Sequence, residues 1–179
     1  MVVARSVTWH YIFILSCMKK IKITKGVGTG PTPLSAFDAA LFNAGIGNYN
    51  LIHLSSVIPP HHEPVVEQVA DNNDVSTYGK RLYCVYASAA TVERGTSVFA
   101  GLGWVMTDEE PKRGLFVEHT GHSREEVQNQ IEESLTSMVS YRTENYGKIE
   151  SEITGAECIA DPLCVIVAAF YENQPWSSE

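Results

Sequence analysis

Two adjacent serines, Ser55 and Ser56, lie where a short apolar stretch leads into a proline pair, Pro59-Pro60. A strand interior has no need of consecutive serines, and proline cannot continue a sheet ladder, so we expect the pair where the chain leaves a strand. A serine hydroxyl in such a place can attack the carbonyl carbon just before it, if hydrogen bonds hold that carbonyl. Taken alone, the pair is more often an ordinary turn at a strand end, because short patterns match by chance.

Two carboxylates are candidates for further chemistry. Asp38 is the only formal charge between Gly26 and His62, in a predicted helix that is apolar on several faces. A buried carboxylate requires a cationic partner, and a guanidinium suits it because two charge-assisted hydrogen bonds form in parallel. Glu118 follows the apolar run 115–117, so an alternating strand would turn it inward, where desolvation raises the pKa of a carboxyl. On spacing alone, a strand-end surface carboxylate is the better interpretation of Glu118, and Asp38 can equally be a helix residue paired with a distant arginine or with solvent.

The order of the motifs around these residues resembles the pyruvoyl-dependent arginine decarboxylase family. Three consecutive patterns carry the resemblance: Pro-Leu-x-Ala-Phe-Asp ending at Asp38, Asn-Ala-Gly-Ile-Gly-Asn ending at Asn48, and Asn-Leu-Ile-x-x-Ser-Ser-x-x-Pro-Pro ending at Pro60. The resemblance resumes at 114–121 and, more weakly, at 164–171. A match this long and ordered is far more specific than a single short motif.

The resemblance implies that the protein cuts its own backbone. Ser56 Oγ would attack the Ser55 carbonyl, giving a β chain of residues 1–55 and an α chain of residues 56–179. Residue 56 would become dehydroalanine and then a pyruvoyl group, the only cofactor expected, with neither pyridoxal phosphate nor a metal. Asn50 matches the family's oxyanion donor for this cleavage, and Glu118 matches its proton donor. Asp38 and the new C-terminus at Ser55 match its substrate-binding residues.

The implied reaction is decarboxylation of L-arginine to agmatine and CO2, which would serve either polyamine biosynthesis or acid resistance. The same chemistry on another amino acid is the nearest alternative, because histidine decarboxylases of this type also mature at a Ser-Ser pair. The helix carrying Asp38 favours the arginine type. A non-catalytic paralogue that keeps the trimeric assembly is an alternative of another class, which the presence of every candidate residue disfavours. The family further implies an αββα sandwich forming trimers or dimers of trimers, with active sites between subunits.

The elements that must position these residues follow from the residue pattern. A short strand is predicted over 21–24, a flexible glycine turn over 26–30, and a helix over 34–44 that ends at Gly45. One face of this helix is expected to hold Leu34, Phe37, Leu41 and Ala44. Downstream, strands are predicted over 81–91, 96–106, 115–119, 148–154 and 163–171, with a capping box at 123–126 opening a long helix to about Tyr146. The apolar stripe of this long helix is expected to hold Val127, Ile131, Leu135, Met138 and Val139. Strands and helices in this order indicate an α+β fold.

Composition indicates a folded globular protein and disfavours several classes of partner and site. A chain of 179 residues with 44% apolar and 19% charged residues fits one folded domain. A net charge of −8 disfavours nucleic acid and anionic membranes as partners. The four cysteines form no Cys-x-x-Cys pair, which disfavours a zinc ribbon. Cys84 and Cys164 lie in apolar runs, which is typical of reduced thiols and favours a cytoplasmic protein.

Motifs for metal binding, phosphate binding and hydrolysis are either incomplete or absent in the sequence. His61-His62-Glu63, and the histidines at 119 and 122 beside Glu118, offer metal ligands, but neighbouring histidines usually point apart, so no metal site is expected. The glycines at 26–30 lack the lysine of a phosphate-binding loop, and no Gly-x-Ser-x-Gly hydrolase motif is present.

Residues 1–17 precede the resemblance. Their apolar run, 9–17, is too short to span a bilayer, and no small-residue cleavage site follows it. Met18 opens a charged start followed by a strand pattern. We therefore expect residues 1–17 to be a wrongly assigned extension and residues 18–179 to form the decarboxylase domain.

Overall fold

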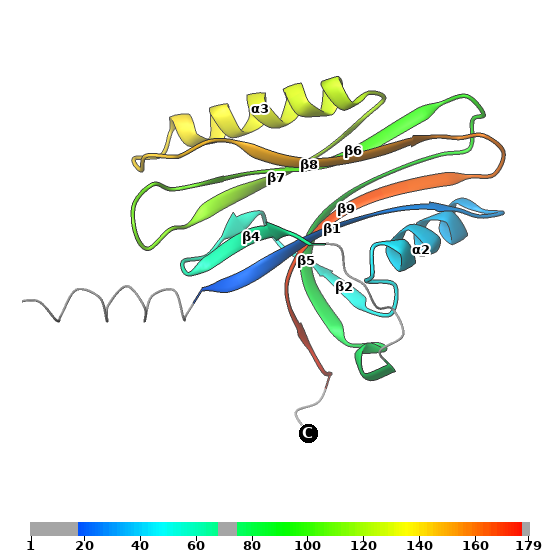
Figure 1. Cartoon of the computed structure of the whole chain (residues 1–179), viewed down its shortest axis with the longest axis horizontal. Helices are drawn as coiled ribbons and strands as arrows, with labels where there is room; N and C mark the ends of the chain where they lie inside the picture. Colours follow the sequence, from blue (N-terminus) through cyan, green and yellow to red (C-terminus); the bar gives the residue numbers. More distant parts are fainter. Residues whose placement is uncertain (1–17, 68–74, 177–179) are drawn as a thin grey trace, which may run out of the picture.

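Two β-sheets lie face to face, and one helix covers the outer face of each (Figure 1). The computed structural model describes residues 18–67 and 75–176. The predicted extension at 1–17 and part of the polar loop after β4 lie outside the described residues. Within them, the predicted α+β fold and its αββα layering are confirmed.

The five-stranded sheet has the order β2-β5-β9-β1-β4. At its centre, β9 (Leu163–Gln174) runs antiparallel to both β5 (Arg81–Thr91) and β1 (Lys19–Thr29). The two edge strands, β2 (Asn50–His53) and β4 (His62–Val66), are each parallel to their neighbour. Helix α2 (Pro33–Asn43) packs on the outer face of this sheet, and the short 3-10 helix η1 (Val75–Thr77) precedes β5.

The four-stranded sheet has the order β3-β7-β6-β8 and is antiparallel throughout. It consists of β3 (Val57–Ile58), β7 (Gly114–Gly121), β6 (Ser97–Met106) and β8 (Glu150–Glu157). Helix α3 (Arg124–Ser140) lies along its outer face, at the top of Figure 1. The buried stripe of α3, Val127, Ile131 and Leu135, is the predicted one.

The space between the sheets is filled by apolar side chains from both. One cluster joins Ile21, Ile23, Ile58, Val85, Leu102, Trp104, Phe116, Val167 and Ala169. Burial of side chains as large as Phe116 contributes about 1.5–3 kcal/mol each. This cluster therefore fixes the two sheets relative to one another, and with them the residues at their edges.

The predicted glycine turn at 26–30 is wrong, because β1 runs straight through Gly26 and Gly28. Both glycines are paired with β9. Among the described glycines, a positive φ occurs only at Gly45, Gly79 and Gly95. A Cβ on Gly28 would collide with backbone atoms of Ala36, Ala39 and Ala40 in α2. The glycines are therefore required for the close approach of a helix to a strand.

The single face predicted for Leu34, Phe37, Leu41 and Ala44 is only partly observed. The helix lies close to the sheet on its alanines, and Ala36, Ala40 and Ala44 are completely buried. Leu41 is buried beside Ala44, but Leu34 is 77% exposed. Leu34, Asp38 and Phe42 are spaced by four residues, so they form one outward stripe.

Helix α3 ends at Ser140, earlier than the predicted end near Tyr146. After the helix the chain turns back toward the four-stranded sheet. Glu144 accepts a hydrogen bond from the Arg113 guanidinium at 2.8 Å, and Tyr146 forms an isolated antiparallel β-bridge with Thr107. These contacts with the end of β6 and the loop before β7 replace the last predicted helical turn.

Candidate active site

The Ser55-Ser56 pair joins the two sheets. β2 ends at His53 beside β5 in one sheet, and β3 begins at Val57 beside β7 in the other. The peptide bond between the serines therefore lies in the crossing from one sheet to the other. The predicted position, where the chain leaves a strand, is the observed one.

Glu118 of β7 meets Ser56 at this crossing. Ser56 Oγ donates a hydrogen bond to Glu118 Oε1, and both residues are half-buried. Glu118 lies two positions after the buried Phe116, so their side chains are on the same face of β7. The carboxylate borders an open cavity of about 400 Å³ that is also lined by Tyr86, Ala87, Ser88, His119, Thr120 and Gln130. The structure thus brings together a hydroxyl, an acid and space for a small molecule.

The carbonyl groups of residues 55, 56 and 57 each accept a hydrogen bond. The Val57 N–H donates to the Ser55 oxygen at 2.8 Å, and the Phe116 N–H donates to the Ser56 oxygen at 2.9 Å. The Tyr171 hydroxyl donates to the Val57 oxygen at 3.1 Å. Burial, with a smaller contribution from the negative charge of Glu118, raises the pKa of Tyr171, so its hydroxyl keeps the proton it donates.

These three donors are absent from the sequence-based prediction. Two of them are backbone N–H groups, which every residue except proline carries, so they leave no signal in the sequence. Tyr171 ends the weakly resembling segment 164–171, and that was its only signal.

Asp38 and Asn50 lie in a second cluster. They border another cavity, of about 380 Å³, together with Phe42, Gly47, Asn48, Tyr49, Tyr78 and Gly79. The Asn50 side-chain amide donates to the Gly79 oxygen at 2.7 Å. Asp38 is exposed, so the argument from a buried carboxylate does not hold within one chain.

The two clusters are well separated along β5. Asn50 is paired with Arg81, whereas the Glu118 cavity begins at Tyr86. Five residues of strand span about 16 Å at about 3.3 Å per residue. Among the described residues, no residue lines both cavities. One chain therefore brings Ser55, Ser56 and Glu118 together, but not Asp38 and Asn50 with them.

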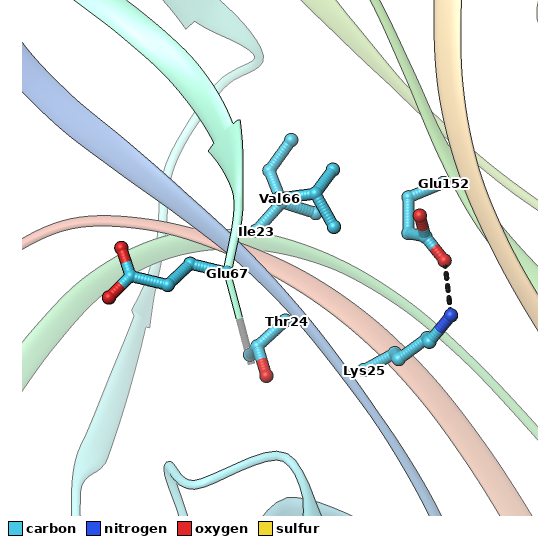
Figure 2. A pocket seen from close by; sticks show the side chains of 6 residues that line it. All are labelled: Ile23, Thr24, Lys25, Val66, Glu67 and Glu152. Carbon is cyan, nitrogen blue, oxygen red and sulfur yellow. Dashed lines mark hydrogen bonds and ion pairs between the residues drawn. The ribbon is translucent and has the colours of Figure 1, made fainter. Parts of the chain in front are cut away.

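Another pocket lies between β1, β4 and β8, away from all these residues (Figure 2). It is small, about 50 Å³, and is crossed by an ion pair of 2.6 Å between Lys25 and Glu152. Figure 2 shows Glu67 pointing away from this pair; its carboxylate instead binds Lys22 at 3.1 Å. The pocket holds none of the predicted site residues.

Burial determines the chemistry of three further side chains, those of His119, Cys84 and Cys164. His119 Nε2 lies 2.8 Å from Ser134 Oγ of α3, and burial lowers the pKa of this histidine. Burial raises the pKa of Cys84 to about 12 and that of Cys164 to about 11, so neither thiol is a ready nucleophile. Within residues 18–67 and 75–176, no three His, Cys, Asp or Glu side chains are grouped to hold a metal ion.

Over the same described residues, no helix is long and apolar enough to cross a membrane.

Comparison with known proteins supports the resemblance noted in the sequence. Residues 20–174 match the family model described as pyruvoyl-dependent arginine decarboxylase. A protein of that name from Halobacterium salinarum is 32% identical over 163 residues, covering 88% of this chain and 98% of the relative. Its namesake from Pyrococcus furiosus is 34% identical over 154 residues, covering 84% and 92%. Pyruvoyl-dependent arginine decarboxylase 1 of Archaeoglobus fulgidus is 30% identical over 154 residues, covering 86% and 97%.

Proposed function

The chain belongs to the pyruvoyl-dependent arginine decarboxylase family, and on that premise we propose that it cleaves itself between Ser55 and Ser56 and then decarboxylates L-arginine to agmatine and CO2. The observation that carries this proposal is the contact of Ser56 Oγ with Glu118 beside a held Ser55 carbonyl. A nucleophile, an electrophile and an acid–base group meet at one peptide bond.

Self-cleavage uses atoms of the chain and one water molecule. Ser56 Oγ attacks the Ser55 carbonyl carbon, its proton passes to the amide nitrogen, and the C–N bond breaks to leave an ester. Loss of the Cα proton of residue 56 with cleavage of its Cβ–Oγ bond releases Ser55 as a carboxylate. Dehydroalanine then remains at residue 56, and water replaces its nitrogen as ammonia to give the ketone.

The residues around position 56 fit a pyruvoyl group formed there. When present, the group supplies a ketone that takes up the substrate amine and draws electrons from the bond to the departing carboxylate. The Phe116 N–H already holds the carbonyl of residue 56, which is part of that group. Glu118 accepts a hydrogen bond from the Ser56 hydroxyl, and this contact supports its role as the proton donor.

We propose that the complete site forms between two copies of the chain. Asn50, which borders the same cavity as Asp38, lies about 16 Å along β5 from the start of the Glu118 cavity, which is too far for one small substrate to contact both. Asp38 lies on the outward stripe of α2 next to the exposed Leu34, a stripe with apolar surface for a neighbouring copy to cover. In a trimer or dimer of trimers, Asp38 and Asn50 of one copy would face Ser56 and Glu118 of the next.

Each residue then has a role in the composite site. Asp38 would receive the substrate guanidinium through paired hydrogen bonds, and the Ser55 carboxylate would contact the substrate. Asn50 would donate a hydrogen bond to the reacting carbonyl at the 55–56 cleavage site of the neighbouring copy.

The decisive experiment is the intact mass of the purified protein under denaturing conditions. We expect two fragments, residues 1–55 and residues 56–179, the larger one beginning with pyruvoyl rather than serine. Release of CO2 should be measured on arginine, histidine, ornithine and lysine. A single uncut chain would overturn the cleavage, and faster turnover of another amino acid would overturn the substrate.

A further inference from the structure

We infer that the backbone N–H of Val57 is the catalytic donor that stabilises the oxyanion formed at Ser55 during self-cleavage. This inference rests on the proposed cleavage between Ser55 and Ser56. It adds to that proposal a group that no side-chain pattern reveals.

The Val57 N–H already contacts the reacting carbonyl. It donates to the Ser55 oxygen at 2.8 Å, which closes a three-residue turn of the γ type centred on Ser56. The Ser55 oxygen is the atom that gains negative charge when Ser56 Oγ attacks the Ser55 carbon. A hydrogen bond to that oxygen becomes charge-assisted as the charge develops, and therefore strengthens in the transition state.

A second hydrogen bond orients this donor. The Ser56 carbonyl and the Val57 N–H are two ends of one planar peptide unit. The Phe116 N–H binds the carbonyl end at 2.9 Å, so the plane is fixed and its N–H end is directed at the Ser55 oxygen.

Phe116 is held by packing, since its side chain is completely buried and its ring packs edge-on against Tyr171. The donor is thus arranged before the reaction begins, which is the condition under which such donors are effective.

The next peptide unit along the chain is held as well. Tyr171 donates its hydroxyl to the Val57 oxygen at 3.1 Å. By contrast, Asn50, the donor suggested by the family motif, donates to Gly79 in its own chain. Asn50 could reach the 55–56 cleavage site only of another copy, whereas the Val57 N–H contacts the cleavage site of its own chain.

The test replaces one N–H by oxygen. Valine at position 57 is exchanged for its α-hydroxy acid by nonsense suppression, so that an ester stands in place of the amide and the side chain is kept. Cleavage is followed over time by denaturing gel and intact mass, which separates cutting at 55–56 from hydrolysis of the new ester. We expect cleavage to slow about 100- to 1,000-fold, the usual effect of removing one oxyanion donor.

Two matched controls keep the Val57 N–H. An α-hydroxy acid at position 58 introduces an ester one residue later, and ordinary valine inserted at position 57 by the same suppression restores the amide. Both should cleave at nearly the wild-type rate. An ester at 57 that cleaves as fast as these controls overturns the inference and leaves the proposed function intact. If the wild-type chain stays uncut, the proposed function itself fails.

Hydrogen exchange provides a second measurement that needs no cleavage. In the Ser56→Ala chain, which lacks the nucleophile, the Val57 amide should exchange slowly despite its exposed side chain, because it remains bonded to the Ser55 oxygen. Exchange at the rate of an unbonded amide would show that the donor is not in place.

Discussion

Ser56 Oγ donates a hydrogen bond to Glu118 Oε1, although 62 positions separate the two residues in the chain. Phe116, two residues before Glu118, holds the carbonyl of Ser56 through its backbone N–H. One stretch of β7 thus binds residue 56 through both its side chain and its main chain. The following predictions test what this arrangement does.

Replacing Ser56 by alanine should abolish cleavage and activity. Alanine has no hydroxyl to attack the Ser55 carbonyl, so the chain should remain a single band on a denaturing gel. Ser55→Ala is the matched control, because the Ser55 side chain takes no part in bond breaking. A cleaved Ser56→Ala protein would show that another group breaks the bond.

Replacing Glu118 by glutamine should separate processing from turnover. The glutamine carbonyl can still accept the Ser56 hydrogen bond, so cleavage should proceed. An amide cannot deliver a proton, so kcat on arginine should fall about 100-fold or more. The gel reports the first effect and CO2 release the second; unchanged kcat would remove Glu118 from the reaction.

Mixed oligomers should show whether the site is shared between copies. Asp38→Ala and Glu118→Gln chains are each expected to be nearly inactive. When the two are co-expressed in equal amounts, about one quarter of the interfaces should pair a normal Asp38 with a normal Glu118, if mixing is random and the assembly cyclic.

Activity near that fraction supports a site between copies. No recovery, in oligomers shown by tagged purification to be mixed, would place the whole site within one chain.

The two fragments should remain together after cleavage. Residues 1–55 contribute β1, which is paired on both sides with β9 and β4, and β2, which is paired with β5. Cutting at 55–56 removes none of these pairings. Size-exclusion chromatography under native conditions should therefore give one peak containing both fragments. Separation without denaturant would contradict the observed strand pairing.

Replacing Gly28 by alanine should destabilise the fold. The added methyl group would collide with the backbone of α2, which cannot move away as a side chain would. Overpacking of this kind costs about 1–3 kcal/mol of unfolding free energy, or more. Thermal unfolding in the uncut Ser56→Ala background measures the loss. Thr29→Ala, at an exposed end of the same strand, is the control and should stay within about 0.5 kcal/mol.

The sequence alone indicated which residues are candidates for chemistry and which elements hold them. Covalent order places Ser55 and Ser56 between an apolar strand and a proline pair, and the motif around them led to the correct family. The α3 stripe and its Ser123 cap were also predicted correctly, since both depend on spacing within one helix. Such features are local, and residue pattern is sufficient to find them.

Only the tertiary structure decided how distant segments meet. Residue spacing could not show that Gly28 lies under α2, nor that Leu34 faces outward, because both depend on how closely helix and sheet approach. It could not find the N–H donors at Val57 and Phe116, because a backbone group has the same chemistry at every residue and acquires a role only from its position. The separation of Asp38 from Glu118 likewise follows from strand pairing between segments far apart in the chain.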